Sequence, residues 1–311
     1  MQSHTFHDFD DFASAVRDVD SIMLLRNPQR RLWTIDAVDL QSVDVQLGRL
    51  GSGNIAQGEL RPDGYLLYLP LTDGVEYTGN GVRLDMNSFA VLEPGCEFCI
   101  STKEQHNWCG VFVPTAAFGG GLNGHSSGYG KTTLRVARQD RQTADRFRSS
   151  VQQILFAASC SDFEHTAAAE CARAELVRTV ARIVAGCRKG ETQGSGRPVI
   201  PRREIIRRAA QHLEMQAGEP VSVGDLASAA EVSERTLRTA FNEYFGMGPV
   251  RYLQLKQLHQ VRRVLRAADP EAVTVTNVLL ECGEWEFSRF ASRYRRQFGE
   301  LPSKTLRTNG R

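Results

Sequence analysis

Two stretches near the C-terminal end share a pattern of hydrophobic and polar positions that predicts two helices joined by a short turn. In the first stretch, residues 221–246, Ser222 and Asp225 have the spacing of a capping box, which satisfies backbone N–H groups at a helix start. After a break at 230–232, Ser233 is expected to cap a second helix that ends at Gly246. The apolar positions of this second helix recur at helical spacing and are expected to be buried: Leu237, Ala240, Phe241 and Phe245.

The second stretch is a weaker copy of the first. A short apolar helix ends at Cys282–Gly283, and a further helix runs to Gly299, ahead of Pro302. The expected buried side of that helix is Phe287, Phe290, Ala291, Tyr294 and Phe298. Between the two copies, Pro249 opens a helix that reaches about Ala267 and is therefore about 28 Å long. Because a turn of B-DNA is about 34 Å, helices held at its two ends could enter successive major grooves on one face of the duplex.

Basic and hydroxyl side chains occupy the outward positions of both second helices. The candidate DNA contacts are Arg235, Thr236, Arg238, Thr239 and Asn242 in the first copy and Ser288, Arg289, Ser292, Arg293, Arg295 and Arg296 in the second. Arg235 and Arg238 are expected to read base edges, since a guanidinium pairs well with guanine. Arg295 and Arg296 are expected to position phosphates. On the connecting helix, the arginines at 262, 263 and 266 are expected to be solvated or structural.

These residues resemble the DNA-binding domain of AraC/XylS-type transcription regulators. The resemblance covers residues 204–307, about a third of the chain, and is carried by SERTLRTAF (233–241), FGMGPVRYL (245–253) and FSRFASRYRRQFGELPSKTLR (287–307). It implies a sequence-specific activator with two helix-turn-helix units, double-stranded DNA and RNA polymerase as partners, and a homodimeric state. One position departs from the family. Gly283–Glu284 stands where a Gly-Phe pair is usual, and Trp285 or Phe287 is expected to supply the missing apolar anchor.

The N-terminal half has a different pattern. From about residue 32 to 114, short apolar runs alternate with turn residues, and strands are predicted at 43–50, 64–71, 89–95, 97–101 and 108–114. An acidic amphipathic helix is predicted at 8–20, and a helical pair at about 140–188. That pair is expected either to form a dimer surface or to pack on the strands. The strand pattern predicts a small antiparallel barrel or double-sheet jelly roll, and the resemblance implies a cupin-like sensing domain. The expected fold class is α+β, with an N-terminal β-barrel flanked by helices and an all-α C-terminal domain.

Length and charge indicate how the chain is divided. Its 311 residues predict two domains, a sensing and dimerisation domain at 1–188 and a DNA-binding domain at 200–311, joined by a glycine-rich linker at 189–199. From Arg197 onward there are 19 Lys and Arg against 13 Asp and Glu, whereas the preceding part has 19 against 23. Only the C-terminal part therefore has the balance expected of a phosphate-binding surface. Seven irregularly spaced cysteines, no apolar run of membrane-spanning length and no secretory signal pattern predict a cytoplasmic protein with reduced thiols.

The predicted barrel is expected to bind an unknown small-molecule effector, since barrels of this size often hold one ligand. Candidate lining residues are Tyr65, Tyr68, Glu97, His106 and Trp108. A zinc or thiol site could use Cys96, Cys99, His106 and Cys109, but small buried core residues are the favoured interpretation of these cysteines. The glycine-rich run 119–130 lacks the spacing of a phosphate-binding loop and is expected to be a connection. No catalytic residue, metal or cofactor is assigned.

Two other functions remain open from the sequence. In one, the barrel is a cupin-type enzyme and the C-terminal domain tethers it to DNA; the absence of a tight His-x-His with a downstream Glu and His argues against this. In the other, the regulator needs no effector and the N-terminal domain only dimerises. A barrel interior that is closely packed throughout would favour this effector-independent regulator.

Overall fold

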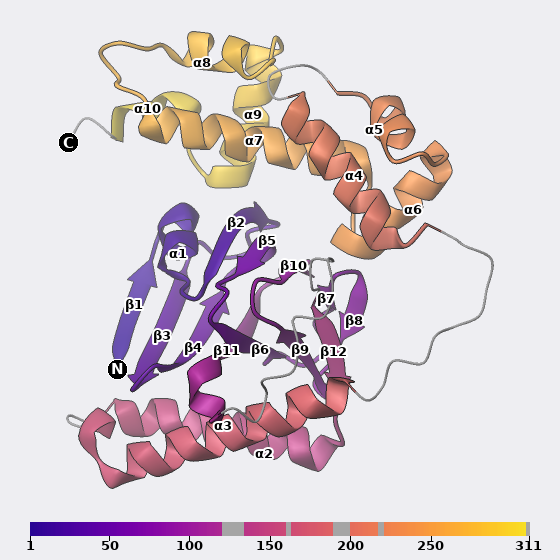
Figure 1. Ribbon diagram of the computed structural model, residues 1–311. Coiled ribbons are helices and arrows are strands. Elements are labelled where there is room, and N and C mark those ends of the chain that lie inside the picture. The colour runs from indigo at the N-terminus through magenta and orange to yellow at the C-terminus, as the bar shows by residue number, and fades with distance from the viewer. Residues whose placement is uncertain (120–133, 160–162, 189–199, 217–220, 309–311) are drawn as a thin grey trace. The chain divides into compact units, whose positions relative to one another are not determined.

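The computed structural model describes residues 1–119, 134–159, 163–188, 200–216 and 221–308 (Figure 1). The chain divides into two compact units, Met1–Arg197 and Pro198–Arg311. The predicted linker 189–199 lies outside the described residues, as does all but the first residue of the glycine-rich run 119–130.

The N-terminal unit consists of two antiparallel sheets and the helices against them. The seven-stranded sheet has the order β1-β3-β4-β11-β6-β9-β12, and the five-stranded sheet has the order β2-β5-β10-β7-β8. The strands of the first sheet are β1 (Gln2–Phe6), β3 (Trp33–Leu40), β4 (Val43–Leu50), β6 (Gly64–Pro70), β9 (Ser88–Leu92), β11 (His106–Pro114) and β12 (Arg135–Arg138). Those of the second are β2 (Val19–Arg26), β5 (Gly53–Leu60), β7 (Tyr77–Gly79), β8 (Val82–Leu84) and β10 (Glu97–Thr102). From β4 to β11 the chain passes repeatedly from one sheet to the other, which gives the predicted double-sheet architecture.

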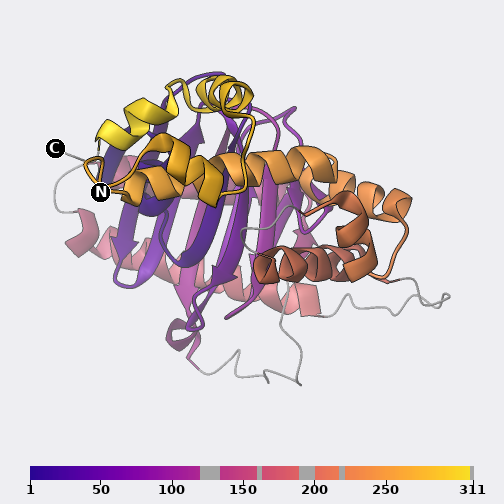
Figure 2. The same cartoon turned by 90° about the horizontal axis from the view of Figure 1, so that it is seen from above.

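Helices α2 (Arg141–Ala158) and α3 (Ala167–Arg188) cover one face of the seven-stranded sheet (Figures 1 and 2). Side chains alternate across each strand, so Cys109, Val111 and Val113 of β11 face these helices and enter one hydrophobic core with Phe147 and Leu176. Trp108 and Phe112 occupy the alternate positions of β11, so they point to the other face of the sheet, toward the interior between the two sheets. The helical pair therefore packs on the sheet, while its use as a dimer surface stays a prediction.

Two sequence-based boundaries in this unit are wrong. The predicted acidic helix 8–20 is only α1 (Phe9–Ala15), because Val16 is already extended and Asp18 has a φ of 69°, after which Val19 begins β2. The strands also reach beyond the predicted range 32–114, to β1, β2 and β12. The sequence of β1 gives little hydrophobic signal because its residues are exposed or only partly buried, and it is held by backbone pairing with β3.

The C-terminal unit is all-helical, as predicted. Its helices are α4 (Arg202–Met215), α5 (Val223–Ala229), α6 (Glu234–Phe245), α7 (Pro249–Ala267), α8 (Val275–Glu281), α9 (Phe287–Phe298) and α10 (Pro302–Thr308). The capping box of Ser222 and Asp225 is present in both directions, and Ser233 accepts a hydrogen bond from the Thr236 N–H. Both glycine stops are confirmed, with φ of 63° at Gly246 and 80° at Gly299. Two helix-turn-helix units, α5–α6 and α8–α9, thus lie on either side of the long helix α7 in the chain.

Candidate nucleic-acid interface

Helix α6 presents a polar face to solvent. Arg235, Arg238, Thr239 and Asn242 are exposed, while Thr236 is half-buried and bonded to Ser233. Arg238 pairs with Glu234 at 3.0 Å, but both side chains are more than half exposed. Such a pair stabilises weakly, so the guanidinium can leave it for a stronger partner. The sequence-predicted contacts of the first unit therefore lie together on one accessible face.

The opposite side of α6 is held by a stack of aromatic rings. Phe245 stacks on Tyr252 of α7 at a centroid distance of 4.4 Å, and Phe241 meets the same ring edge-on at 5.5 Å. The predicted core positions Leu237, Ala240, Phe241 and Phe245 are all buried. Because α6 is packed so closely on α7, its outward side chains are displayed from a rigid support.

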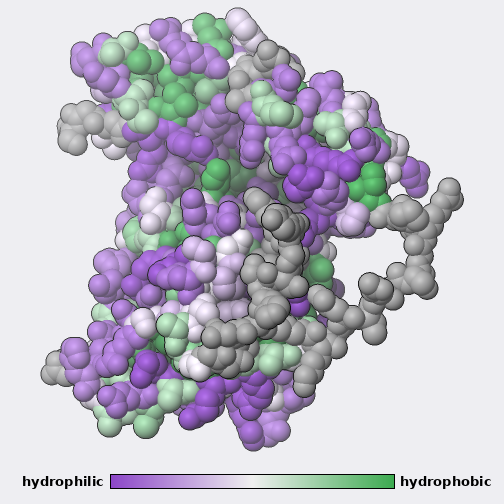
Figure 3. All heavy atoms as spheres, in the orientation of Figure 1, coloured by the Kyte–Doolittle hydropathy of each residue, from purple (hydrophilic) through white to green (hydrophobic). Residues whose placement is uncertain are grey.

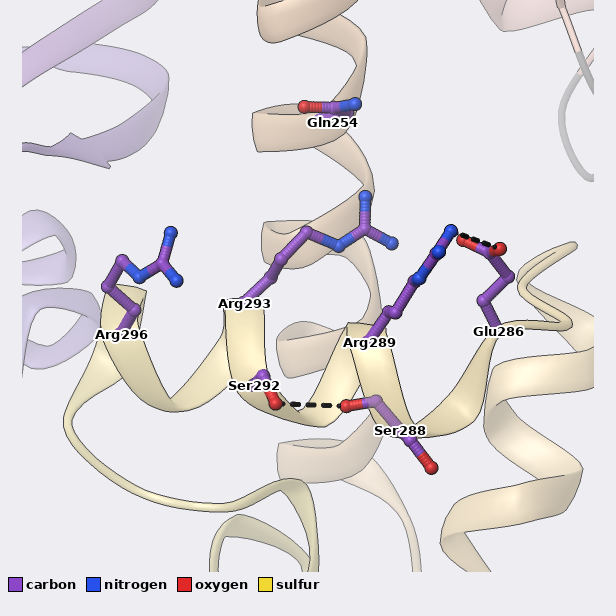
Figure 4. Close-up of a pocket in the computed structure, with 7 residues that line it drawn as sticks. All are labelled: Gln254, Glu286, Ser288, Arg289, Ser292, Arg293 and Arg296. Atoms are coloured by element: carbon purple, nitrogen blue, oxygen red, sulfur yellow. Dashed lines mark hydrogen bonds and ion pairs between the residues drawn. The ribbon is translucent and has the colours of Figure 1, made fainter.

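All the predicted contacts on helix α9 except Arg295 line a concave surface (Figure 4). This surface, hereafter the α9 hollow, has a volume of about 570 Å³. It is lined by Gln254, Glu286, Ser288, Arg289, Ser292, Arg293 and Arg296. In the close-up, the three arginine side chains extend toward the side on which Gln254 of α7 lies, and Ser288 points away from it. Gln254 was not among the sequence-predicted residues, because a glutamine on a connecting helix has no distinguishing spacing.

The apolar anchor predicted at the start of α9 is wrong. Trp285 is 71% exposed and Phe287 37% exposed, so neither fills a buried site. Glu284 is buried instead, at 6% exposure, and its carboxylate accepts hydrogen bonds from the Glu286 N–H and from Arg293 at 2.7 Å. An ionic pair therefore occupies the place expected for a hydrophobic contact. In the space-filling view, hydrophobic residues are visible between predominantly hydrophilic ones on this unit (Figure 3).

A second buried ionic group lies between α7 and the C-terminal helices. The Arg262 side chain is 6% exposed; its guanidinium donates to Glu300 at 2.9 Å and to Tyr294 at 3.3 Å, and it lies 4.6 Å from the Phe298 ring centre. Although burial would raise the pKa of Glu300, the hydrogen bonds from Arg262 and Thr305 bring that pKa below its ordinary value. Arg262 is therefore structural, whereas Arg263 is exposed.

The five predicted effector contacts do not form one cluster. Tyr68 and Trp108 stack at 5.9 Å on the interior side of the seven-stranded sheet, and His106 lies on the same face of β11 as Trp108. Tyr65 belongs to the opposite face, in the core with α2 and α3. Glu97 is the first residue of β10, where it pairs with Glu59 of β5. Because side chains alternate along a strand, Glu97 points to the other face of β10 from Thr102, which contacts His106. Tyr65 and Glu97 therefore lie away from the group formed by Tyr68, His106 and Trp108.

His106 has a filled hydrogen-bond environment. Its Nδ1 lies 3.1 Å from the Ser52 carbonyl and 3.0 Å from the Glu104 carbonyl, and its ring meets Tyr77 edge-on. Burial lowers the pKa of His106 to about 4. It is therefore a neutral imidazole at physiological pH. The Tyr68 and Trp108 side chains are also buried, and no hydrogen bond from the Tyr68 hydroxyl or the Trp108 indole N–H to a described residue is found.

The cysteines near His106 lie on different surfaces. Cys109 faces α2 and α3, on the opposite side of β11 from His106, and burial raises the pKa of its thiol. Among the described residues, no three His, Cys, Asp or Glu side chains are arranged to hold a metal ion. A helix of sufficient length and hydrophobicity to span a membrane is likewise not found in the described part of the chain.

Comparisons with known proteins identify relatives of this chain. Residues 226–308 match a protein family described as a helix-turn-helix domain. The chain is 34% identical over 119 residues to "XylDLEGF operon transcriptional activator 2" of Pseudomonas putida, covering 38% of this chain and 71% of that protein. It is 35% identical over 112 residues to "Probable thc operon regulatory protein" of Rhodococcus erythropolis, covering 36% of this chain but only 33% of that protein. Among solved structures, a probable AraC family transcriptional regulator from Rhodopseudomonas palustris is 28% identical, with a TM-score of 0.31, over 34% of this chain and 96% of that one.

Proposed function

The chain belongs to the AraC/XylS family of transcription regulators, and we propose that it activates transcription by reading one DNA sequence with α6 and α9. Regulation of transcription through DNA binding is common to the family. The finer assignment, to an activator that works in the cytoplasm as a homodimer together with RNA polymerase, is our proposal. It draws on the P. putida relative, whose name describes a transcriptional activator.

The observation that carries the proposal is the exposed face of α6. Arg235, Arg238, Thr239 and Asn242 project from a helix whose other side is locked by aromatic packing, as major-groove reading requires. We assign Arg235 and Arg238 to base edges, because a guanidinium pairs bidentately with guanine. Asn242 has the chemistry to pair with adenine, while Thr236 and Thr239 lie beside these readers. In the second unit we assign Ser288 and Ser292 to base edges and Arg295 and Arg296 to phosphates.

An effector site in the N-terminal unit is the second part of the proposal. Tyr68 and Trp108 offer two hydrogen-bond donors and two stacked rings inside the double sheet, a combination that suits a small molecule with an apolar body and an acceptor group. Such an effector can act only if it binds one arrangement of the two DNA-binding units more tightly than another. His106 then supports the pocket wall, since its ring nitrogens already have partners.

One observation favours the variant of this function that needs no effector. The Trp108 ring fills the space over Gly48, where an added Cβ would lie 2.4 Å from it. A ligand would therefore have to displace Trp108 or lie beside it. Soaking small-molecule libraries against the purified protein and following its melting temperature distinguishes the two, since a dimerisation-only domain gives no ligand-dependent rise.

The experiment that tests DNA reading is binding to fragments from upstream of the protein's own gene, across a salt series and against unrelated competitor DNA. We expect one fragment to resist competitor and its affinity to fall steeply with salt, as phosphate contacts require. Equal affinity for every fragment at every salt concentration would contradict sequence reading and leave only charge-driven association.

A further inference from the structure

We propose that Glu284 is a positioning residue that directs Arg293 into the α9 hollow, where Arg293, Arg289 and Gln254 of α7 together clamp one DNA phosphate. This inference rests on the proposed DNA-binding function and deepens it, because it names a third element of the interface. It also separates the polar side chains of α9 by task. Arginines on the α7 side would hold the backbone, and Ser288 and Ser292 would face the bases.

The orientation of Arg293 is determined from two sides. The Glu284 carboxylate accepts its hydrogen bond at 2.7 Å, and the guanidinium lies 5.7 Å from the Phe290 ring centre. The Glu284 side chain is 8% exposed and Arg293 is 30% exposed, so this pair is desolvated far more than the pairs on α6. A charge-assisted bond in such surroundings restricts a long side chain to one direction.

The charge in the hollow favours an anion. Arg289, Arg293 and Arg296 line it together with one carboxylate, that of Glu286. The Arg289–Glu286 pair is exposed on both sides, at 77% and 59%, and such a pair is easily replaced by a phosphate oxygen. Gln254 is exposed and makes no hydrogen bond to the residues that the structure describes, so its amide N–H is available for a second oxygen.

The shape of the hollow favours backbone over base. It lies between the reading helix and the connecting helix, and three arginine side chains of α9 extend toward the side of Gln254 (Figure 4). Guanidinium forks match phosphate geometry, whereas base edges are reached by side chains that project along the exposed ridge of a reading helix. Among the described residues of α6, Arg238 pairs with the exposed Glu234 and not with a buried carboxylate. The proposed phosphate clamp is therefore assigned to the second unit.

The test uses the full-length protein and a duplex that the wild-type protein selects from a random-sequence pool. Single phosphates are replaced, one position at a time, by neutral methylphosphonates. Wild-type affinity should fall about tenfold at the clamped position, the loss expected for one charge-assisted hydrogen bond. R293A should lose about tenfold on unmodified DNA, reduce the salt slope by about one, and lose nothing further at that position.

Three gentler variants guard against a folding effect. Q254A changes only an exposed side chain. In this variant, replacing the clamped phosphate by a methylphosphonate should lower the affinity less than it does in the wild-type protein. E284Q keeps the guanidinium but not its anchor, and should reduce the methylphosphonate effect without changing sequence preference. R293K, which keeps the charge, should recover part of the affinity. The matched controls are E281Q, an exposed carboxylate at the end of α8, and R263A, an exposed arginine on α7; both should show the wild-type methylphosphonate profile.

One result would overturn the clamp. If every methylphosphonate lowers the affinity of R293A and Q254A as much as it lowers that of the wild-type protein, neither side chain contacts a phosphate. A changed sequence preference in R293A also overturns it, since that result makes Arg293 a base reader. These outcomes leave the proposed function intact as long as the wild-type protein still selects a sequence. Failure of the wild-type protein to select any sequence would overturn both proposals.

Discussion

The two helix-turn-helix units share one geometry but use different chemistry to hold it. In the first, α6 is capped by Ser233 and packed on α7 through Phe241, Phe245 and Tyr252. In the second, α9 begins without a side-chain cap, and its surroundings contain the Glu284–Arg293 pair and the Arg262–Glu300 group. Both units therefore have an apolar core, and the second adds buried ionic hydrogen bonds to it.

This difference extends to DNA recognition. The arginines of α6 are exposed, and the pair that Arg238 makes is weak, so both are suited to choosing base partners. On α9, Arg293 is held by a buried carboxylate, so it offers one fixed direction. A fixed guanidinium suits a phosphate, whose position hardly varies with sequence. We therefore expect α6 to contribute most of the sequence preference and α9 a larger share of sequence-independent affinity.

The largest expected effect is on the ionic core of the second unit. R262M removes the partner of the partly buried Glu300 carboxylate and should lower the local free energy of unfolding by about 3–5 kcal/mol. Pulse-labelling hydrogen exchange of peptides from α7 to α10 during urea unfolding measures this. R263M, at the exposed neighbouring arginine, should change little, and adding E300L to R262M should restore most of the loss. Equal behaviour of R262M and R263M would contradict a structural role for Arg262.

The next effect is on reading by the first unit. R235A or R238A should weaken binding to the selected sequence by about 1–3 kcal/mol and relax the preference at one or two base pairs. Selection from a random pool, repeated with each variant, measures both quantities. The matched comparison is R295A, which should weaken all sequences alike. A uniform loss in R235A and R238A would make them phosphate contacts, and no loss would remove α6 from the interface.

Helix capping gives a smaller contrast between the units. S233A removes the acceptor for the Thr236 N–H and should cost about 1 kcal/mol of local stability in α6. E286A in the corresponding position of α9 should cost less, because Glu286 makes no side-chain cap bond. Exchange rates of the first-turn amides in both helices report this directly. An equal acceleration of amide exchange in the two helices would show that the caps do not distinguish the units.

The smallest effect is a dependence on acid. Because the pKa of Glu300 is held below its ordinary value of 4.5, the ionised group stabilises the second unit above that pH, and the stabilisation is lost as pH falls through the lower folded-state pKa. Local stability of α9 and α10 should therefore decline as pH falls below about 4.5. E300Q should make this decline shallower than it is in the wild-type protein. A decline that is equally steep in E300Q would assign it to another carboxylate.

The sequence predicted those features that depend on residues close together in the chain, and missed those that depend on contacts between distant residues. The helices of the C-terminal unit were predictable because caps, apolar spacing and the stops at Gly246 and Gly299 act within a few residues. Burial of Glu284 was missed, because only the distant placement of Arg293 makes a carboxylate tolerable there. In the barrel, alternation separated Tyr65 from Tyr68, but which face is interior depends on the sheets and helices that pack against it.

Hydroxyl-radical footprinting of the wild-type protein on its selected duplex tests the central claim most directly. Two reading helices at the ends of α7 predict two protected stretches on one face of the DNA, separated by about 10 base pairs. The R235A/R238A double variant should lose protection at one stretch and keep it at the other. A single protected stretch, or two that disappear together, would contradict an interface built from two separate reading helices.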